Sequence, residues 1–203
     1  SRAFRRIAAT LDPAIQLHVT FLDENDPHGI ADRIADPAVR RSCLVIASPD
    51  HPAVRQALTA AMAQGLPVVQ VVSQTLQGAR YVGIDNYAAG RVAAMMLARL
   101  GAVRGKVAVL CHSHVYTVHR DRVRGFSDYL REHAFDGPDF VHVAFGFDDR
   151  DQSSRRIHDL VARWPDLAGL YNVGGANGAV LDTLRRLRPR VFFVGHELND
   201  VTS

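Results

Sequence analysis

Apolar runs of strand length alternate with segments of helical period along the sequence, and this alternation constrains the fold more than any other feature. It predicts parallel sheets wrapped by helices, because parallel strands need a long crossover connection that is usually helical. The expected strands are Gln16–Leu22, Ser42–Ala47, Pro67–Val72, Arg80–Ile84, Lys106–Cys111, Phe140–Phe145, Gly169–Tyr171 and Val191–Gly195. The expected helices, most of them ended by a glycine or proline, are Arg2–Leu11, His51–Gln64, Tyr87–Leu100, His119–His133, Ser153–Arg163 and Asn177–Leu187.

A domain boundary is expected at Gly101–Gly105, where one helix ends and a second strand–helix series begins. We therefore divide the chain into an N-terminal lobe, residues 1–104, and a C-terminal lobe, residues 105–203, with about four strands in each. Two open parallel sheets place a ligand cleft at the carboxyl ends of their strands. The first lobe is expected to lack an opening strand and the second its closing elements.

Composition and charge favour a globular protein and do not indicate a DNA-binding surface in this part of the chain. The 24 Lys and Arg residues are interspersed with 21 acidic residues, so the net charge of +3 indicates a mixed solvated surface. No apolar run approaches the roughly 20 residues of a membrane-spanning helix, and no secretory signal is recognisable. Cys43 and Cys111 lie in apolar runs and are expected to be buried free thiols. These features favour a cytoplasmic protein without membrane contact.

Catalytic, metal and cofactor motifs are not recognisable in the sequence. There is no Gly-x-Ser-x-Gly elbow, and the acidic run Asp148–Asp151 most simply begins a helix. The histidines in Cys111–His114 and His119 fit no standard zinc spacing, so we expect them to line a pocket or a loop. The glycines before the last helix complete no phosphate loop. We therefore predict that the chain is not an enzyme and holds no metal or cofactor.

Tyr81–Ala94, Arg120–Leu130 and Val191–Leu198 are the segments that carry a family resemblance. Together they resemble the effector-binding core of LacI/GalR-family transcriptional regulators. Tyr81–Ala94 is similar to a strand-turn-helix segment of the first lobe, which periplasmic sugar-binding proteins share. Arg120–Leu130 resembles the R-x-x-G-F/W helix that opens the second lobe, and Val191–Leu198 resembles the V-V-G-[YFH]-[DE] strand end. Weaker similarities lie at Leu66–Gln74 and Leu167–Ala179. The resemblance implies a two-lobed type I periplasmic binding protein-like α/β fold.

The same resemblance implies which residues bind the ligand. Arg122 matches the arginine that holds the effector, and its guanidinium suits two adjacent sugar hydroxyls. Glu197 stands where most members carry an Asp that accepts hydrogen bonds from a sugar. Asn172 matches the ligand-contacting Asn, although Asn177 is an alternative because Val-Gly-Gly follows Asn172. The remaining expected ligand-binding residues are Ser73, Asp85, Tyr116, Phe147 and Asp148.

Two of these positions keep a structural alternative. Asp85 either caps the following helix alone or also contacts the ligand. Phe147 either stacks on the C–H face of a sugar or seals the core at a strand end.

The function implied by the resemblance is the ligand-binding core of a LacI-family repressor that senses a small polar effector, which we expect to be a sugar. Such a repressor would bind operator DNA through a separate N-terminal helix-turn-helix headpiece and would act as a homodimer. The alternative is a periplasmic sugar-binding protein of an ABC transporter, which has the same fold. A headpiece or a signal peptide encoded before Ser1 would distinguish the two.

Overall fold

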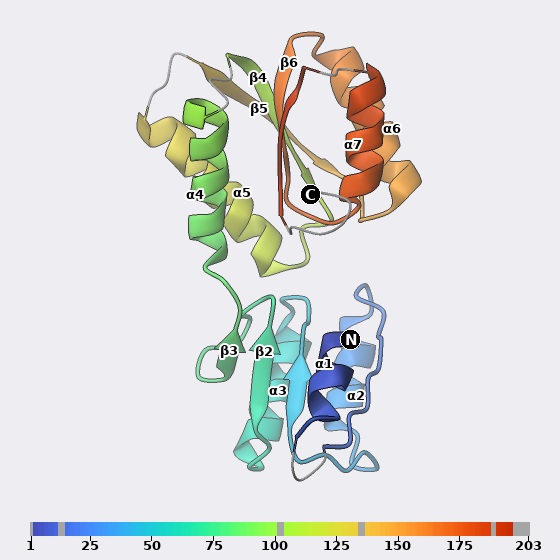
Figure 1. Ribbon diagram of the computed structural model, residues 1–203. Helices are drawn as coiled ribbons and strands as arrows, with labels where there is room; N and C mark the ends of the chain where they lie inside the picture. Colours follow the sequence, from blue (N-terminus) through green and yellow to red (C-terminus); the bar gives the residue numbers. More distant parts are fainter. Residues whose placement is uncertain (1, 12–14, 101–103, 134–136, 188–189, 197–203) are drawn as a thin grey trace.

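The computed structural model describes residues 2–11, 15–100, 104–133, 137–187 and 190–196, which form two lobes stacked end to end (Figure 1). Each lobe is built around one parallel sheet, as the alternation of strands and helices predicts. Within those ranges no helix is both long and apolar enough to cross a membrane.

The first lobe contains a three-stranded sheet in the order β1-β2-β3. Its strands are β1 (Leu44–Ile46), β2 (Val68–Val71) and β3 (Arg80–Val82). Helices α2 (Pro27–Ala35) and α3 (Pro52–Ala63) pack on each other and bury their apolar stripes against the sheet. The core residues shared by these elements include Ile30, Ile34, Val54, Leu58 and Val68. Helix α1 (Arg2–Ala8) precedes them in the chain.

Helix α2 was missed by the sequence analysis, although its start carries a clear signal. The Asp26 carboxylate accepts a hydrogen bond from the Gly29 backbone N–H at 2.8 Å, and Pro27 occupies the first turn, where its lost N–H has no helical partner. An Asp-Pro pair at this position is a usual helix start.

The predicted strand Gln16–Leu22 is wrong, because this segment pairs with no strand in the described structure. Phe21 is 86% exposed. Apolar residues with β propensity become a strand only when a neighbouring strand supplies hydrogen bonds. Cys43 is also exposed, against expectation, whereas Cys111 is buried, and both are free thiols.

The second lobe contains a four-stranded sheet in the order β5-β4-β6-β7. Its strands are β4 (Gly105–Cys111), β5 (Pro138–Phe145), β6 (Leu167–Asn172) and β7 (Phe192–Gly195). Helix α5 (Thr117–His133) covers one face, and α6 (Arg150–Arg163) and α7 (Asn177–Leu187) cover the other. The chain runs from β4 outward to β5 and then returns past β4 to β6. This reversal opens a crevice at the carboxyl ends of β4 and β6.

Helix α4 (Asn86–Met95) and the short π-helix η1 (Met96–Leu100) pack in the core of the second lobe, although the sequence placed them within the 1–104 lobe. Ala93 and Leu97 are buried there beside Val107. The chain therefore passes between the two cores at residues 83–85, ahead of α4. The glycine after residue 100 marks where a helix stops, but it carries no information about which sheet the helix covers.

Candidate ligand-binding cleft

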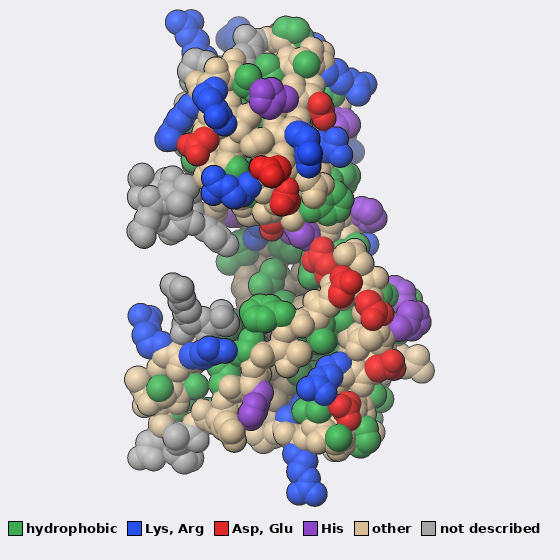
Figure 2. Space-filling view, turned by 90° about the vertical axis from the view of Figure 1, so that its right-hand side faces the viewer, with side chains coloured by type: hydrophobic (Ala, Val, Ile, Leu, Met, Phe, Trp, Pro, Cys, Tyr) green, Lys and Arg blue, Asp and Glu red, His purple; other side chains and the backbone are tan. Residues whose placement is uncertain are grey.

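The loops at the carboxyl ends of the two sheets face each other, and Figure 2 shows a hollow between the lobes. Beside this hollow the lobes touch through backbone and side chains. The Asp50 N–H donates to the Val115 carbonyl at 3.1 Å, and Arg120 Nη2 lies 2.7 Å from Asp50 Oδ2. Asp50 follows β1 and Arg120 lies in the first turn of α5, so this ion pair joins the first lobe to the second.

His112 lies at the centre of a polar cluster where the lobes meet. Its Nε2 is 2.6 Å from Oε1 of Glu24, in the first lobe. Its Nδ1 is 3.5 Å from Oδ2 of Asp148 and is buried without a hydrogen-bond partner. The backbone of His112 is also engaged, since its N–H donates to Nδ1 of His119 at 3.3 Å and its carbonyl accepts from the Phe147 N–H at 3.0 Å. His112 therefore connects the loop after β4 with the Glu24 segment of the first lobe, with helix α5 and with the loop after β5.

The loops after β4, β5 and β6 converge at the crevice of the second sheet. Asp148 Oδ1 accepts a hydrogen bond from the Gly175 N–H at 2.7 Å. A Cβ at Gly174 would overlap the Asp148 carboxylate and crowd the backbone nitrogen of His112. Glycine at position 174 therefore allows the close approach of these loops.

Arg122 spans the junction through which the chain passes from one lobe to the other. Its Nε donates to Asn86 Oδ1 at 2.9 Å, and Nη1 donates to the Val173 carbonyl at 2.8 Å. Asn86 in turn donates to the Val72 carbonyl of the first lobe at 3.3 Å. One guanidinium therefore connects α5, α4 and the end of β6, which suits its fixed, forked donors.

Aromatic rings surround His112 on the side of the second lobe. The ring centroids of Tyr116 and Phe147 lie 6.1 Å and 6.2 Å from that of His112. Phe147 and Asp148 both have a positive φ of 54°, a conformation that costs a non-glycine residue about 1–3 kcal/mol. Strain of this kind is concentrated at ligand sites, and Phe147 is 48% exposed.

Burial keeps three titratable side chains near the cleft, those of Tyr116, His119 and His196, uncharged. It lowers the pKa of His119 and of His196 to about 4, with a smaller contribution from charged neighbours. Burial also raises the pKa of Tyr116, and Glu24 adds to this effect. At neutral pH these groups therefore act as hydrogen-bond donors and acceptors without charge.

Of the residues predicted from sequence, Tyr116, Arg122, Phe147 and Asp148 lie together around the crevice. The predicted Glu197 falls outside the described residues. Ser73 follows the first-lobe strand β2, is 2% exposed, and has no hydrogen-bond partner for its hydroxyl.

Asp85, Asn172 and Asn177 have evident structural roles. Asp85 is exposed and caps α4 by accepting the Ala88 N–H at 2.9 Å. The Asn172 amide donates to Asn177 Oδ1 at 2.7 Å and to the Gly175 carbonyl at 2.8 Å. Asn177 Nδ2 donates to the His196 carbonyl at 3.0 Å. Both amide groups therefore hold the turn between β6 and α7, and a ligand contact for either stays a prediction.

Sequence reasoning missed Glu24, Asp50 and Asn86 as residues of this region. Glu24 and Asp50 follow apolar runs that were expected to be strands, so the strand-end rule would have included them. Asn86 directly follows the predicted Asp85 and was not among the residues expected to bind the ligand. In the part of the chain that the structure describes, no three His, Cys, Asp or Glu side chains are arranged to hold a metal ion.

Comparison with known proteins gives both a family and similar folds. A family model described as a periplasmic binding protein domain matches residues 33–202. The structure of XylFII is similar with a TM-score of 0.84 and 20% identity, over 99% of this chain and 75% of that one. GanP, a glucose-galactose binding protein from Geobacillus stearothermophilus, gives 0.83 and 20%, over 99% and 73% of the two chains.

A third similar structure is an ABC transporter solute binding protein from Agrobacterium vitis bound with alpha-D-tagatopyranose. It has a TM-score of 0.80 and 21% identity, over 98% of this chain and 71% of that one. Among curated proteins, none matches the sequence. At these identities the similar structures establish the fold.

Proposed function

Because the chain belongs to the periplasmic binding protein domain family, we propose that it binds a monosaccharide in the cleft between its lobes and that binding closes the cleft. The family consists of binding proteins, which agrees with the absence of catalytic motifs from the sequence. The observation that carries the proposal is the convergence of polar groups from both lobes on one crevice, with Glu24 of the first lobe in contact with His112 of the second.

The chemistry of these groups supports an uncharged ligand rich in hydroxyls. Carboxylates at Glu24 and Asp148 accept hydrogen bonds, the guanidinium of Arg122 donates them, and neutral imidazole does either. Negative and positive side chains are both present, so a strongly charged ligand has no complementary surface of one sign. The exposed ring of Phe147 supplies an apolar face of the kind on which sugar C–H groups stack.

We favour a solute-binding protein of the transporter type over the repressor core. The similar structures named above include a sugar-binding protein and an ABC transporter solute binding protein, and this supports the alternative weighed from the sequence. In this proposal the closed, ligand-bound form is what a transporter recognises.

A repressor core is the second candidate, and the match of Arg120–Leu130 to the R-x-x-G-F/W helix supports it. It would place the protein in the cytoplasm, as a homodimer that contacts operator DNA through a separate headpiece. The coding sequence upstream of Ser1 distinguishes the candidates, because a signal peptide supports transport and a helix-turn-helix supports repression.

Binding itself is tested by calorimetry with a panel of uncharged pentoses and hexoses that includes D-glucose, D-galactose and D-tagatose. We expect saturable binding of at least one sugar, and Arg122→Ala should weaken it about ten- to a hundredfold, because a buried charge-assisted hydrogen bond is lost. Arg185→Ala, on the outer side of α7, is the control and should bind as the unaltered chain does. Failure of every sugar at millimolar concentration, or unchanged affinity in Arg122→Ala, would contradict the proposal.

A further inference from the structure

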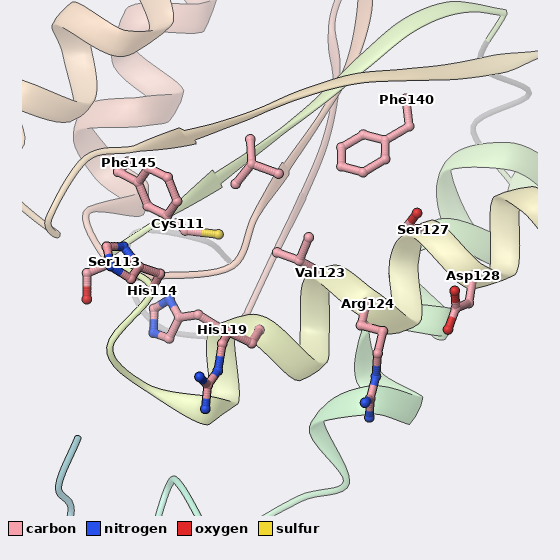
Figure 3. Close-up of a pocket in the computed structure, with 12 residues that line it drawn as sticks. Cys111, Ser113, His114, His119, Val123, Arg124, Ser127, Asp128, Phe140 and Phe145 are labelled. Carbon is pink, nitrogen blue, oxygen red and sulfur yellow. The ribbon is translucent and has the colours of Figure 1, made fainter. Parts of the chain in front are cut away.

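A cavity of about 420 Å³ that is partly open to solvent lies in the second lobe, between helix α5 and strands β4 and β5. Figure 3 shows Phe140 and Phe145 of β5 and Cys111 of β4 on one side, with Val123 and Ser127 of α5 opposite them. This volume falls within the range of small-molecule sites, which are concave and mostly apolar with a few polar groups.

The walls of the cavity are apolar and uncharged along most of its length. Burial raises the pKa of the Cys111 thiol to about 12 and lowers that of the His119 imidazole to about 4, so neither carries a charge near neutral pH. Val143 adds an aliphatic side chain to the two phenylalanines. A charged ligand group would lose its hydration there without finding a counter-charge.

The charged residues of the lining already have partners. Arg120 lies 2.7 Å from Asp50. Arg124 lies 3.4 Å from Asp121, and Figure 3 shows its side chain directed away from the strands. Asp128 accepts from the Tyr87 hydroxyl at 3.0 Å. The charged groups therefore lie at the border of the cavity, and their existing partners leave no need for a ligand of opposite charge.

Two polar groups at the end nearest the cleft are able to bind a ligand. Ser113 is 5% exposed, lines the cavity, and has no hydrogen-bond partner for its hydroxyl. Figure 3 shows this hydroxyl directed away from Val123 and Phe140, so it meets a ligand in the cavity after rotation about χ1 to another staggered position. His119 uses Nδ1 to accept from the His112 N–H, so its neutral ring carries a hydrogen on Nε2, which is a donor. A buried hydroxyl without a partner is unfavourable, and a ligand that forms a hydrogen bond with it would remove that cost.

We propose that this cavity, which adjoins the cleft at His119 and Arg120 and extends away from it between α5 and β5, is a second ligand site for a compact uncharged ring compound that carries one hydroxyl or carbonyl group. The ring lies between Phe140, Phe145 and Val123, and the polar group meets Ser113. The site does not depend on sugar binding in the cleft.

The test uses 2-naphthol, followed by calorimetry and by its fluorescence, with naphthalene and 2-naphthoate as comparisons. We expect saturable binding of 2-naphthol with one site per chain, weaker binding of naphthalene, and little binding of the anionic 2-naphthoate. Ser113→Ala should weaken 2-naphthol about two- to tenfold and leave naphthalene unchanged, because only one hydrogen bond is removed.

Substitutions locate the site. Ser127→Phe fills the cavity from α5 and should reduce 2-naphthol affinity at least tenfold, whereas Thr59→Phe adds the same ring to an exposed position of α3 and should change nothing. Ser73→Ala, a change on the first-lobe side of the cleft, should also leave 2-naphthol binding intact. Binding that survives Ser127→Phe, or that is lost in Ser73→Ala, would overturn the proposal.

A measurement without a bulky substitution keeps the test independent of folding. In a Cys43→Ser chain Cys111 is the only thiol, and 2-naphthol should slow its reaction with methyl methanethiosulfonate as the cavity fills. No binding up to the solubility limit of 2-naphthol, or no protection of Cys111, would rule out the site.

Discussion

Single side chains of the cleft set how the stability of the protein depends on pH. Burial lowers the pKa of His119 and His196 to about 4, whereas both return to about 6.5 in the unfolded chain. Between these two pKa values the histidines are protonated in the unfolded chain but neutral in the folded chain. Their contribution to the free energy of unfolding is therefore fully present above about pH 6.5 and is lost as the pH falls toward 4. We predict that the urea midpoint falls over this interval and that His119→Gln makes the fall shallower. His133→Gln, at the far end of the same helix, should keep the original slope, and equal slopes in both variants would contradict the assignment.

Helices α4 and α5 cross so closely that glycine is required on both. A Cβ at Gly125 would overlap the Tyr87 carbonyl, and one at Gly90 would overlap the Arg122 carbonyl. Alanine normally stabilises a helix interior by about 0.5–1 kcal/mol relative to glycine. At this crossing, however, the added Cβ would force the backbone of the opposite helix to move. We predict that Gly125→Ala destabilises the protein by about 1–3 kcal/mol in urea unfolding, because overpacking exceeds the gain in helix propensity. Arg131→Ala, an exposed change on α5, should stay within about 0.5 kcal/mol. Stabilisation by Gly125→Ala would show that the crossing is not tight.

In the whole molecule, closure of the lobes depends on a small number of polar contacts between them. Glu24 and His112 approach to 2.6 Å, and both side chains are largely shielded from solvent, so their interaction is screened less than that of a surface pair. We predict that Glu24→Ala opens the molecule, seen as a larger radius of gyration in small-angle X-ray scattering without ligand. Asp36→Ala removes the same charge from a pair within the first lobe, Arg33–Asp36, and should not alter the radius. Equal radii in the two variants would exclude Glu24 as a closing contact.

Local sequence determined the elements of this protein where local physics is sufficient. The apolar run Lys106–Cys111 predicts β4, and the period of His119–His133 predicts α5, because strand and helix patterns are written in neighbouring residues. Tyr116, Phe147 and Asp148 could be placed near a crevice because carboxyl ends of parallel strands gather at one edge of a sheet.

Tertiary structure decided the features that depend on partners distant in the chain. Gln16–Leu22 has the composition of a strand, but only a neighbouring strand would make it one. Helix α4 covers the second sheet because its Gly90 fits against α5, which no pattern within α4 reveals. The contact of Glu24 with His112 joins residues of different lobes. This contact forms because the segment with Glu24 and the loop after β4 meet at the same cleft. The pattern of neighbouring residues does not reveal that these two side chains approach each other.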